Sequence, residues 1–246
     1  MRVIVNGITG KMGQIIRNLA QQGFEGSSFV CGVSPDVEVE QGNLHKSFAT
    51  CTEEADVVVD FSFHSGVKEL LDFCTQKNLP VVIATTGHTA DEKLLIEEAA
   101  KRIPVFYSAN MSVGVAVLAD LAKKAASAFP DANIEIIETH HNRKVDVPSG
   151  TALMLADAIH QARPQSINNI GRHENGKRTK EEIGIHSLRI GNVVGIHEIL
   201  ISTGNETITL KHEAHSRALF GEGAMRAAAF LIGKKPGLYT MKDMIG

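Results

Sequence analysis

Residues 135 to 152 gather proton-transfer groups, fixed cations and a helix start into one short stretch. His140 and Lys144 stand out in it, because an imidazole titrates at about pH 6.5 and can donate a proton at neutral pH with help from a neighbouring lysine. Arg143 adds a further fixed positive charge. The stretch therefore predicts acid–base chemistry on an anionic substrate.

The directions of His140 and His141 depend on where the strand predicted for Ile134 to Thr139 ends. If the chain stays extended, the two imidazoles point to opposite faces and one of them faces the cleft. If the chain turns after Thr139, His140 and Lys144 stand at i, i+4 spacing and can share a site. The sequence leaves both arrangements open.

Metal binding is not predicted. Adjacent histidines rarely serve one ion, and no HExxH motif or carboxylate-plus-histidine pattern supplies further ligands. The cysteines are odd in number, widely spaced and without a CxxC or Cys/His pattern, so we expect reduced and mostly buried thiols in a cytoplasmic protein, at Cys31, Cys51 and Cys74.

A helix start follows the histidines. Pro148 holds Val147 extended, and Ser149, Gly150 and Thr151 then open a helix that we expect to run to Ala162. No Glu or Gln completes a capping box, so several first-turn amides could bind a carboxylate, with Gly150 allowing close approach. The alternative is an ordinary Ser or Thr cap that faces water.

A glycine loop stands near the N-terminus, between the strand predicted for Arg2 to Asn6 and a helix. Its sequence is Gly7-Ile8-Thr9-Gly10-Lys11-Met12-Gly13, a GxxGxxG variant of the dinucleotide fingerprint. Small residues permit a tight turn and let helix amides approach a pyrophosphate. We expect a dinucleotide here, the alternative being a tight turn without a ligand.

The choice between NADH and NADPH is left open. An NAD site usually has an acid at the end of the second strand, where this chain has Ser34. Lys11 could meet the 2′-phosphate of NADPH, or be a solvated surface lysine, and Asp36 could still reach the ribose. We expect NADPH to be at least tolerated.

The remaining pattern predicts an α/β fold. Apolar strands alternate with helices up to about residue 110, which indicates a Rossmann-like parallel sheet covered on both faces. After a hinge expected at Ser108 to Ser112, the pattern predicts a mixed α+β domain with a helix at Val113 to Ala128, a polar loop at Ser166 to Lys180 and a mostly antiparallel sheet. A last helix, His215 to Ile232, is expected to pack back on the first domain. We therefore predict a discontinuous dinucleotide-binding domain, 1–110 and 217–246, and a substrate-binding and tetramerisation domain, 111–216.

Composition excludes several classes of partner. The chain has 246 residues and a formal net charge of −3, with no long run of one sign, which argues against nucleic acid and anionic membranes as partners. Its apolar runs are far shorter than the roughly 20 residues that cross a bilayer. Neither a membrane span nor a signal peptide is expected.

The stretch from Glu138 to Ala152 resembles the signature of the 4-hydroxy-tetrahydrodipicolinate reductase family, also called dihydrodipicolinate reductases. The resemblance extends over nearly the whole chain. It includes the glycine loop, residues 84–87, Ser108-Ala109-Asn110-Met111-Ser112-Val113-Gly114-Val115, residues 184–189 and residues 215–217.

The resemblance implies a role for each matching residue. His140 would donate the proton, with Lys144 assisting. Substrate carboxylates would be bound by His141, Gly150 and Thr151. Cofactor contacts would come from Gly7, Ile8, Thr9, Gly10, Lys11, Met12, Ala84, Thr85, Thr86, Ser108, Ala109, Asn110 and Met111, and Ser34 stands where family members usually have an acid.

The implied activity is NADPH- or NADH-dependent reduction of a small cyclic dicarboxylate in diaminopimelate and lysine biosynthesis, carried out by a homotetramer. One alternative is another two-domain nicotinamide oxidoreductase acting on an amino acid or semialdehyde. The other is a nucleotide-sensing protein without catalysis, which gives no reason for His140, Lys144 and the helix start to stand together.

Overall fold

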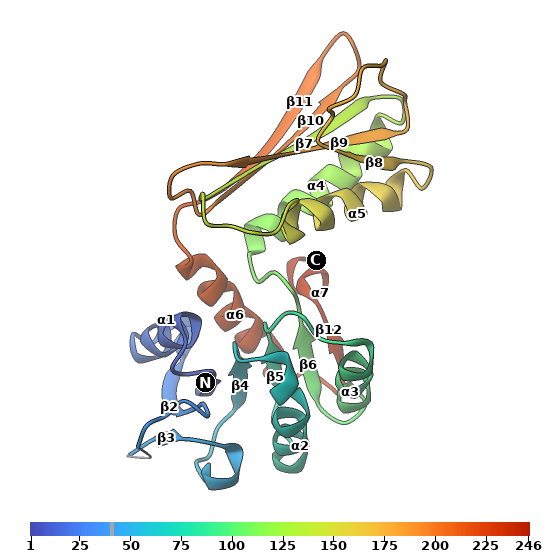
Figure 1. The fold of residues 1–246 in the computed structure, drawn as a ribbon. Coiled ribbons are helices and arrows are strands. Elements are labelled where there is room, and N and C mark those ends of the chain that lie inside the picture. The colour runs from blue at the N-terminus through green and yellow to red at the C-terminus, as the bar shows by residue number, and fades with distance from the viewer. Residues whose placement is uncertain (40–41) are drawn as a thin grey trace. The chain divides into compact units, whose positions relative to one another are not determined.

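The computed structural model describes residues 1–39 and 42–246, which divide into two compact units (Figure 1). Unit 1 comprises Met1–Ser112 and Ala218–Gly246, and unit 2 comprises Val113–Arg217. Each unit has a hydrophobic core of its own.

Unit 1 is built on a parallel seven-stranded sheet, and the predicted Rossmann-like class is confirmed. The strand order is β12-β6-β5-β4-β1-β2-β3. The strands are β1 Arg2–Asn6, β2 Ser28–Val33, β3 Leu44–His45, β4 Val57–Asp60, β5 Val81–Ile83, β6 Pro104–Tyr107 and β12 Gly237–Tyr239. The central strands are runs of Val and Ile that are buried throughout, as expected of a parallel sheet covered on both faces. The short edge strands β3 and β12 were not predicted.

Helices cover both faces of this sheet. Helices α2 (Val67–Lys77) and α3 (Ala90–Ala100) pack over one face, and α1 (Lys11–Gln21) and α6 (Ala218–Leu231) over the other. The short elements are η1 Phe24–Gly26, η2 Phe48–Thr50, η3 His64–Gly66 and α7 Met241–Ile245. The carboxyl ends of β1, β4, β5 and β6 thus lie along one edge of the sheet, where parallel α/β sheets bind ligands.

Unit 2 packs α4 (Val113–Ala128) and α5 (Gly150–Ala162) on one face of a five-stranded sheet with the order β11-β10-β7-β9-β8. The strands are β7 Asn133–His140, β8 Ile167–Ile170, β9 Glu182–Arg189, β10 Gly195–Ser202 and β11 Thr207–Ala214. Alternate residues of β7 and β10 face the helices and form the core.

Two predictions for unit 2 were wrong. The segment Ser166 to Lys180 is not entirely a loop, because Ile167–Ile170 forms the edge strand β8. Its two central residues are Asn168 and Asn169, so the strand does not show the alternation of apolar and polar residues by which strands are predicted. The sheet is not mostly antiparallel either. Strand β10 pairs antiparallel with β7 and β11, whereas β9 pairs parallel with β7 and β8, since α5 and β8 carry the chain back between β7 and β9.

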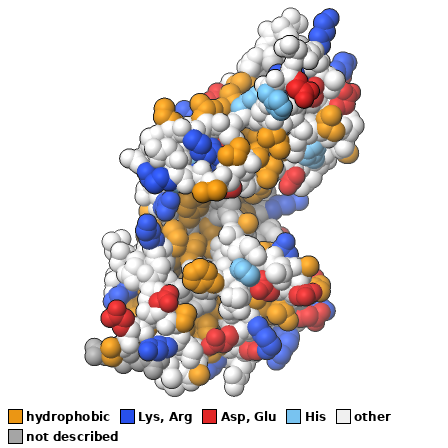
Figure 2. Space-filling view, viewed as in Figure 1, with side chains coloured by type: hydrophobic (Ala, Val, Ile, Leu, Met, Phe, Trp, Pro, Cys, Tyr) orange, Lys and Arg blue, Asp and Glu red, His pale blue; other side chains and the backbone are white. Residues whose placement is uncertain are grey.

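The surface is of mixed charge. On the face shown in Figure 2, acidic and basic side chains are interspersed over unit 1. None of the helices in the described ranges is long and apolar enough to span a membrane.

Candidate active site

Strand alternation brings two titratable side chains together at the end of β7. Ile134 and Ile136 face the core, and the two-residue period places Glu138 and His140 on the same face. Glu138 is fully buried, and His140 is 8% exposed. The apolar face of the strand therefore ends in an acid–imidazole pair beside the start of α5.

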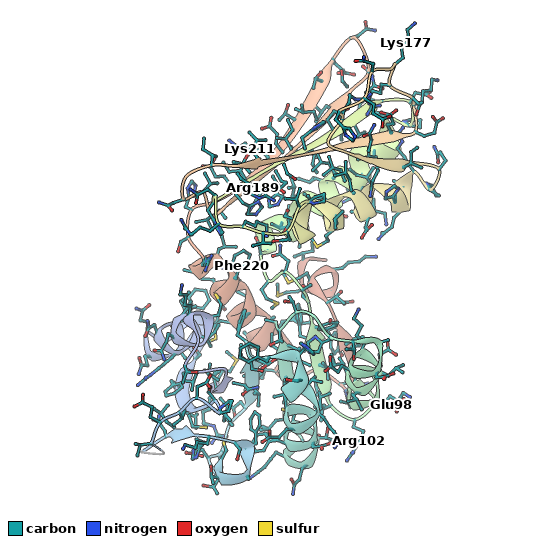
Figure 3. The ribbon with its side chains drawn as sticks, viewed as in Figure 1. Glu98, Arg102, Lys177, Arg189, Lys211 and Phe220 are labelled. Carbon is teal, nitrogen blue, oxygen red and sulfur yellow. The ribbon has the colours of Figure 1, made fainter. Side chains whose placement is uncertain are left out.

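Glu138 is held by four donors. Its Oε2 lies 2.5 Å from Nδ1 of His140. The guanidinium of Arg189, labelled in Figure 3, donates from Nη1 to Oε2 and from Nη2 to Oε1, each at 2.9 Å. The backbone N–H of Ser149 donates to Oε1 at 3.1 Å. Because both carboxylate oxygens are occupied, the position of His140 is fixed by a rigid partner.

The charge of Glu138 determines which ring nitrogen of His140 faces the carboxylate with a proton on it. Burial alone would raise the pKa of this carboxyl, but the hydrogen bonds from Arg189 and His140 outweigh it and lower the pKa to about 2. The ionised carboxylate accepts the proton on Nδ1 of His140, so Nε2 is the ring nitrogen available for transferring a proton. A Cβ at Gly195 would stand 3.1 Å from Nε2, and glycine there leaves that nitrogen room.

A second imidazole, His197 on β10, lies edge to face with His140 at 5.1 Å between ring centroids. Its Nε2 is 3.1 Å from Oγ of Ser149. Burial, together with the charges of His140 and Lys144, lowers the pKa of His197 to about 4. His197 is therefore neutral at physiological pH.

The chain turns just after His140. Strand β7 ends at that residue, and the N–H of Lys144 bonds to the carbonyl of His141 at 3.1 Å. The strand therefore continues through His140 instead of turning after Thr139, and the sharing of one site by His140 and Lys144 stays a prediction. The Lys144 ammonium pairs with Asp146 at 2.8 Å, and that hydrogen bond lowers the pKa of the Asp146 carboxyl.

His141 is the first residue after β7 and is partly buried. Its Nδ1 is buried and has no hydrogen-bond partner within the part of the chain that the structure describes. Burial and the charges of Arg143 and Arg217 lower the pKa of this imidazole. The group is therefore a neutral donor or acceptor beside two fixed cations, which suits a bound carboxylate.

The helix start has a cap. Ser149 is the N-cap of α5, and its Oγ accepts from the N–H of Ala152 at 3.2 Å. A Ser cap is therefore present, but it is buried and does not face water as the alternative supposed. Carboxylate binding by Gly150 and Thr151 stays a prediction. Open space lies beside Gly150, where a Cβ would meet no atom of the described chain within 4 Å.

The glycine loop of unit 1 is shaped by close backbone contacts. Gly7 has a φ of +81°, and a Cβ on it would lie 2.4 Å from the carbonyl oxygen of Phe61. A Cβ on Gly13 would lie 2.2 Å from the carbonyl oxygen of Gly7. Gly10 is the N-cap of α1 and, being glycine, supplies no side-chain cap to the first-turn amides.

Other residues predicted to contact a cofactor lie within this loop or next to it. Ile8 is 1% exposed, so only its backbone can contact a ligand, whereas Lys11 is exposed. Ser34 is buried, and its Oγ lies 2.8 Å from Oγ1 of Thr9. Met12 lies in the first turn of α1.

Two more predicted segments follow neighbouring strands. Ala84, Thr85 and Thr86 come directly after β5, and the segment from Ser108 to Met111 comes directly after β6. The hydroxyl of Ser108 donates to the carbonyl of Asn110 at 2.7 Å, which holds the second segment in a tight turn. Both segments therefore lie at the same edge of the sheet as the glycine loop.

Several polar groups at these sites were not singled out from sequence. They are Glu138, Arg189 and His197 in unit 2. In unit 1, Asp60 ends β4 at the carboxyl edge of the sheet, where the sequence predicts a ligand. Asp60 is 2% exposed and accepts from Asn6 at 2.8 Å and from Ser62 at 2.6 Å, although burial raises the pKa of its carboxyl. Glu138 could have been found from its spacing, because it precedes His140 by two residues on one strand face. Arg189 and His197 come from other strands and gave no local signal.

Comparison with known proteins gives one family over both units. The family model described as dihydrodipicolinate reductase, N-terminus, matches residues 1–111, and that of the C-terminus matches residues 114–245. A 4-hydroxy-tetrahydrodipicolinate reductase of Caldanaerobacter subterraneus subsp. tengcongensis is 46% identical, with 100% of this chain and 98% of the relative covered. One from Clostridium tetani is 45% identical over 100% and 97% of the two chains.

A solved structure agrees. The dipicolinate-bound dihydrodipicolinate reductase of Paenisporosarcina sp. TG-14 matches with a TM-score of 0.76 and 26% identity, covering 98% of this chain and 97% of that one. Together these matches cover both units, and the chain belongs to the dihydrodipicolinate reductase family.

Proposed function

We propose that this chain is an NAD(P)H-dependent reductase that converts 4-hydroxy-tetrahydrodipicolinate to tetrahydrodipicolinate, in diaminopimelate and lysine biosynthesis. Family membership over the full chain supports the reaction class. The observation that carries the chemistry is the 2.5 Å contact between Glu138 and His140, which gives the chain an oriented proton donor.

Unit 1 is the cofactor-binding part of this proposal. The glycine loop fits a dinucleotide, since Gly7 and Gly13 leave room that a Cβ would fill and the start of α1 offers amides to a pyrophosphate. When bound, the reduced nicotinamide supplies the hydride. Further contacts come from the segments after β5 and β6. Ser34 follows β2 at the position where an acid is usual for NAD, which favours a site that takes NADPH as well as NADH.

Unit 2 is the substrate-binding part. The amides of Gly150 and Thr151 and the imidazole of His141 hold the substrate carboxylates, helped by the charges of Arg143 and Lys144. The relative from Paenisporosarcina holds dipicolinate, a planar ring with two carboxylates, which supports a dianionic ring as the ligand here.

His140 is the proton donor of the reaction. After the 4-hydroxyl has left as water, hydride adds at that ring carbon, and Nε2 of His140 protonates the adjacent carbon. Glu138 keeps the Nδ1 proton in place, so the imidazole presents the same nitrogen in every turnover. Lys144 holds a substrate carboxylate near the imidazole, and this positioning lowers the entropic part of the barrier.

The direct test is an assay that follows nicotinamide oxidation with freshly condensed pyruvate and aspartate semialdehyde. Oxidation that requires both precursors, with tetrahydrodipicolinate identified as the product, supports the proposal. Oxidation only with other amino acids or semialdehydes would assign the chain to a different oxidoreductase class. Nucleotide binding without turnover on any substrate would favour a sensing role.

We also propose a homotetramer that works in the cytoplasm. The sheet of unit 2 has helices on one face only, and half-buried apolar residues of the other face, such as Ile137, Ile196 and Leu200, suit contact between copies. The free thiols of Cys31 and Cys51, 3.3 Å apart, suit a reducing compartment. Sedimentation equilibrium tests the assembly, and a monomer at micromolar concentration would contradict it.

A further inference from the structure

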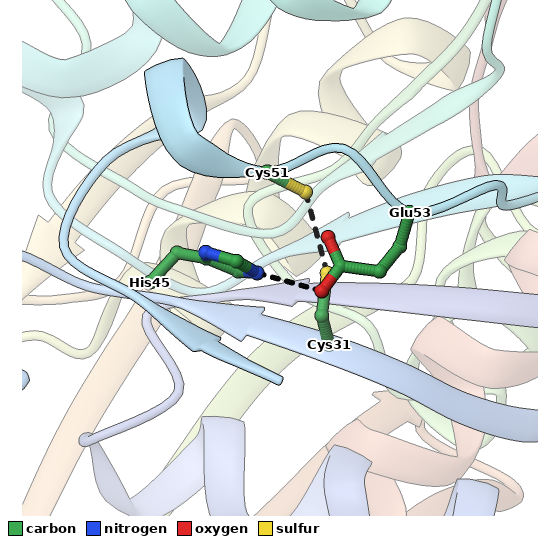
Figure 4. A group of neighbouring side chains, drawn as sticks. All are labelled: Cys31, His45, Cys51 and Glu53. Atoms are coloured by element: carbon green, nitrogen blue, oxygen red, sulfur yellow. Dashed lines mark hydrogen bonds and ion pairs between the residues drawn. The ribbon is translucent and has the colours of Figure 1, made fainter. Parts of the chain in front are cut away.

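Four potential metal ligands meet at the β3 edge of the sheet in unit 1 (Figure 4). Cys31 comes from β2, His45 from β3, Cys51 from the end of η2, and Glu53 from the segment that follows. Their ligand atoms all lie within 4.8 Å of one another. We propose that these four side chains bind one divalent metal ion of the zinc type.

The donor set is that of a structural zinc site. Two sulfurs, one imidazole nitrogen and one carboxylate oxygen are ligands that Zn²⁺ takes in tetrahedral geometry. The cysteines are buried and His45 is 9% exposed, while the Glu53 side chain, 26% exposed, closes the solvent side. A site with four protein ligands and little solvent access holds its metal for folding rather than for chemistry.

The spacing of the ligands is close to what a tetrahedral ion requires. The two Sγ atoms are 3.3 Å apart, and Nε2 of His45 is 2.7 Å from Oε1 of Glu53. With zinc–sulfur bonds of about 2.3 Å and zinc–nitrogen or zinc–oxygen bonds of about 2.0 Å, tetrahedral geometry needs about 3.8 Å and about 3.3 Å for these pairs. Each pair must open by about half an ångström, which side-chain torsions can supply.

The hydrogen bonds of His45 favour a proton or a metal ion at Nε2. Nδ1 lies 3.2 Å from Oγ1 of Thr50, and that hydroxyl donates to the carbonyl of Ser47 at 3.3 Å. Thr50 therefore accepts from Nδ1, which leaves Nε2 of a neutral imidazole as an acceptor facing the Glu53 carboxylate. Two acceptors at 2.7 Å repel unless a proton or a metal ion lies between them.

The second carboxylate oxygen of Glu53 is also a possible metal ligand. Its Oε2 is buried and has no hydrogen-bond partner among the described residues. A buried, unpartnered carboxylate oxygen is costly, and a divalent ion beside two thiols would remove that cost. The thiols would bind as thiolates, releasing their protons to solvent as the metal enters.

A metal ion at this site would hold strand β3 in place next to Ser34, a residue of the proposed cofactor site. His45 pairs with Val33 in the β2–β3 ladder, and its carbonyl accepts from the N–H of Ser34 at 3.0 Å. Metal bound at Cys31 and His45 would thus anchor β3 beside the residue that we assign to the ribose end of the dinucleotide. The metal site itself rests on the four ligands and is independent of the proposed reaction.

The test is metal titration of the full chain, purified under reducing conditions and freed of metal with a chelator. Cobalt(II) added to it should produce the near-ultraviolet charge-transfer band of thiolate ligation, saturating at about one ion per chain. Zinc should then displace cobalt and abolish the band. Bound zinc should also raise the midpoint of thermal unfolding, because it binds only the folded chain.

Variants locate the ion. Glu53→Gln keeps the side-chain volume at a partly exposed position, and Cys51→Ser removes one sulfur. Each should weaken cobalt binding more than the roughly 10- to 100-fold expected for Thr50→Val, which removes only the group that orients His45. Cys74→Ser is the matched control, since Cys74 is a buried thiol outside the cluster and its variant should bind cobalt as the parent chain does.

Three results would overturn the proposal. One is no charge-transfer band from a folded chain whose thiols titrate as reduced. Another is a band that Glu53→Gln and Cys51→Ser leave unchanged. The third is recovery of Cys31 and Cys51 as a disulfide with no metal uptake after its reduction, which would make the pair redox-active instead.

Discussion

Oε2 of Glu138 lies 2.5 Å from Nδ1 of His140, and both side chains project from one face of β7. A carboxylate in this position keeps a proton on Nδ1, and Arg189 keeps the carboxylate in place through two hydrogen bonds. The free ring nitrogen is then always Nε2. The predictions for unit 2 depend on this arrangement.

Replacing His140 by Ala should lower kcat by about 10²- to 10⁴-fold, because that is the usual contribution of a general acid. Binding of NADPH, measured by fluorescence titration, should stay within a factor of two or so, since unit 1 holds the proposed cofactor site. His173→Ala, an exposed histidine of the same unit, is the control. Full turnover in His140→Ala would remove this residue from the mechanism.

The ion pair of Lys144 and Asp146 should oppose substrate binding. The Lys144 ammonium must leave Asp146 to meet a substrate carboxylate, and a partly exposed pair of this kind contributes on the order of 1 kcal/mol. Asp146→Asn should therefore lower the substrate KM by up to about fivefold with little change in kcat. Lys144→Ala should instead lower kcat by about 10²-fold or more. A raised KM in Asp146→Asn would show that the acid orients the lysine rather than competing for it.

The free energy of unfolding of the chain should fall in acid as Glu138 becomes protonated. Its folded-state pKa of about 2 lies below the ordinary 4.5, so its contribution to the free energy of unfolding is complete above about pH 4.5 and is lost as the pH falls toward 2. The loss amounts to roughly 3 kcal/mol. Glu138→Gln should be less stable than the parent chain at pH 7, and the two should converge near pH 2.

Urea unfolding at a series of pH values measures this convergence. Glu206→Gln, at the exposed tip of the β10–β11 hairpin, is the matched control and should follow the parent chain throughout. Parallel curves for Glu138→Gln and the parent chain, from pH 7 to pH 2, would mean that the Glu138 carboxylate gains nothing from its four donors.

Sequence patterns predicted the fold better than they predicted the site. The apolar runs in Arg2–Asn6 and Val57–Asp60 predicted buried parallel strands, because a strand that is buried on both faces has apolar residues at consecutive positions. Strand β8 was missed because an exposed edge strand needs no apolar alternation. Side chains gathered from different strands, such as Arg189 with Glu138, are set by sheet register, which one sequence does not reveal.

The proposed metal ligands illustrate the same limit. Cys31, His45, Cys51 and Glu53 match no familiar spacing, so the cysteines were expected to have no metal role. They meet because β3 pairs with β2 and the chain then returns through η2. The Glu138 pair differs, since both residues belong to one strand and their two-residue spacing was visible.

Two substitutions in the glycine loop should distinguish an effect on folding from an effect on cofactor binding. Gly13→Ala should destabilise unit 1 as well as weaken NADPH binding, because its Cβ would lie 2.2 Å from a backbone oxygen that cannot move freely. Gly10→Ala should fold normally, since its Cβ would lie 3.3 Å from the same oxygen, yet bind NADPH at least about tenfold more weakly if a pyrophosphate approaches there. Gly66→Ala, with open space around it, is the control for both. Normal NADPH affinity in Gly10→Ala would place the pyrophosphate elsewhere.

Cofactor preference should depend on position 34. The NADPH-to-NADH ratio of kcat/KM should fall at least about tenfold in Ser34→Asp, because a carboxylate there accepts the ribose hydroxyls of NADH and repels the 2′-phosphate of NADPH. Ser34→Ala removes the same contact with Thr9 without adding charge, and it should leave the ratio nearly unchanged. Steady-state kinetics with both cofactors measure the ratio. Because Ser34 is buried, thermal unfolding of each variant must accompany the kinetics, and an unchanged ratio in a stable Ser34→Asp variant would place the adenosine ribose away from the end of β2.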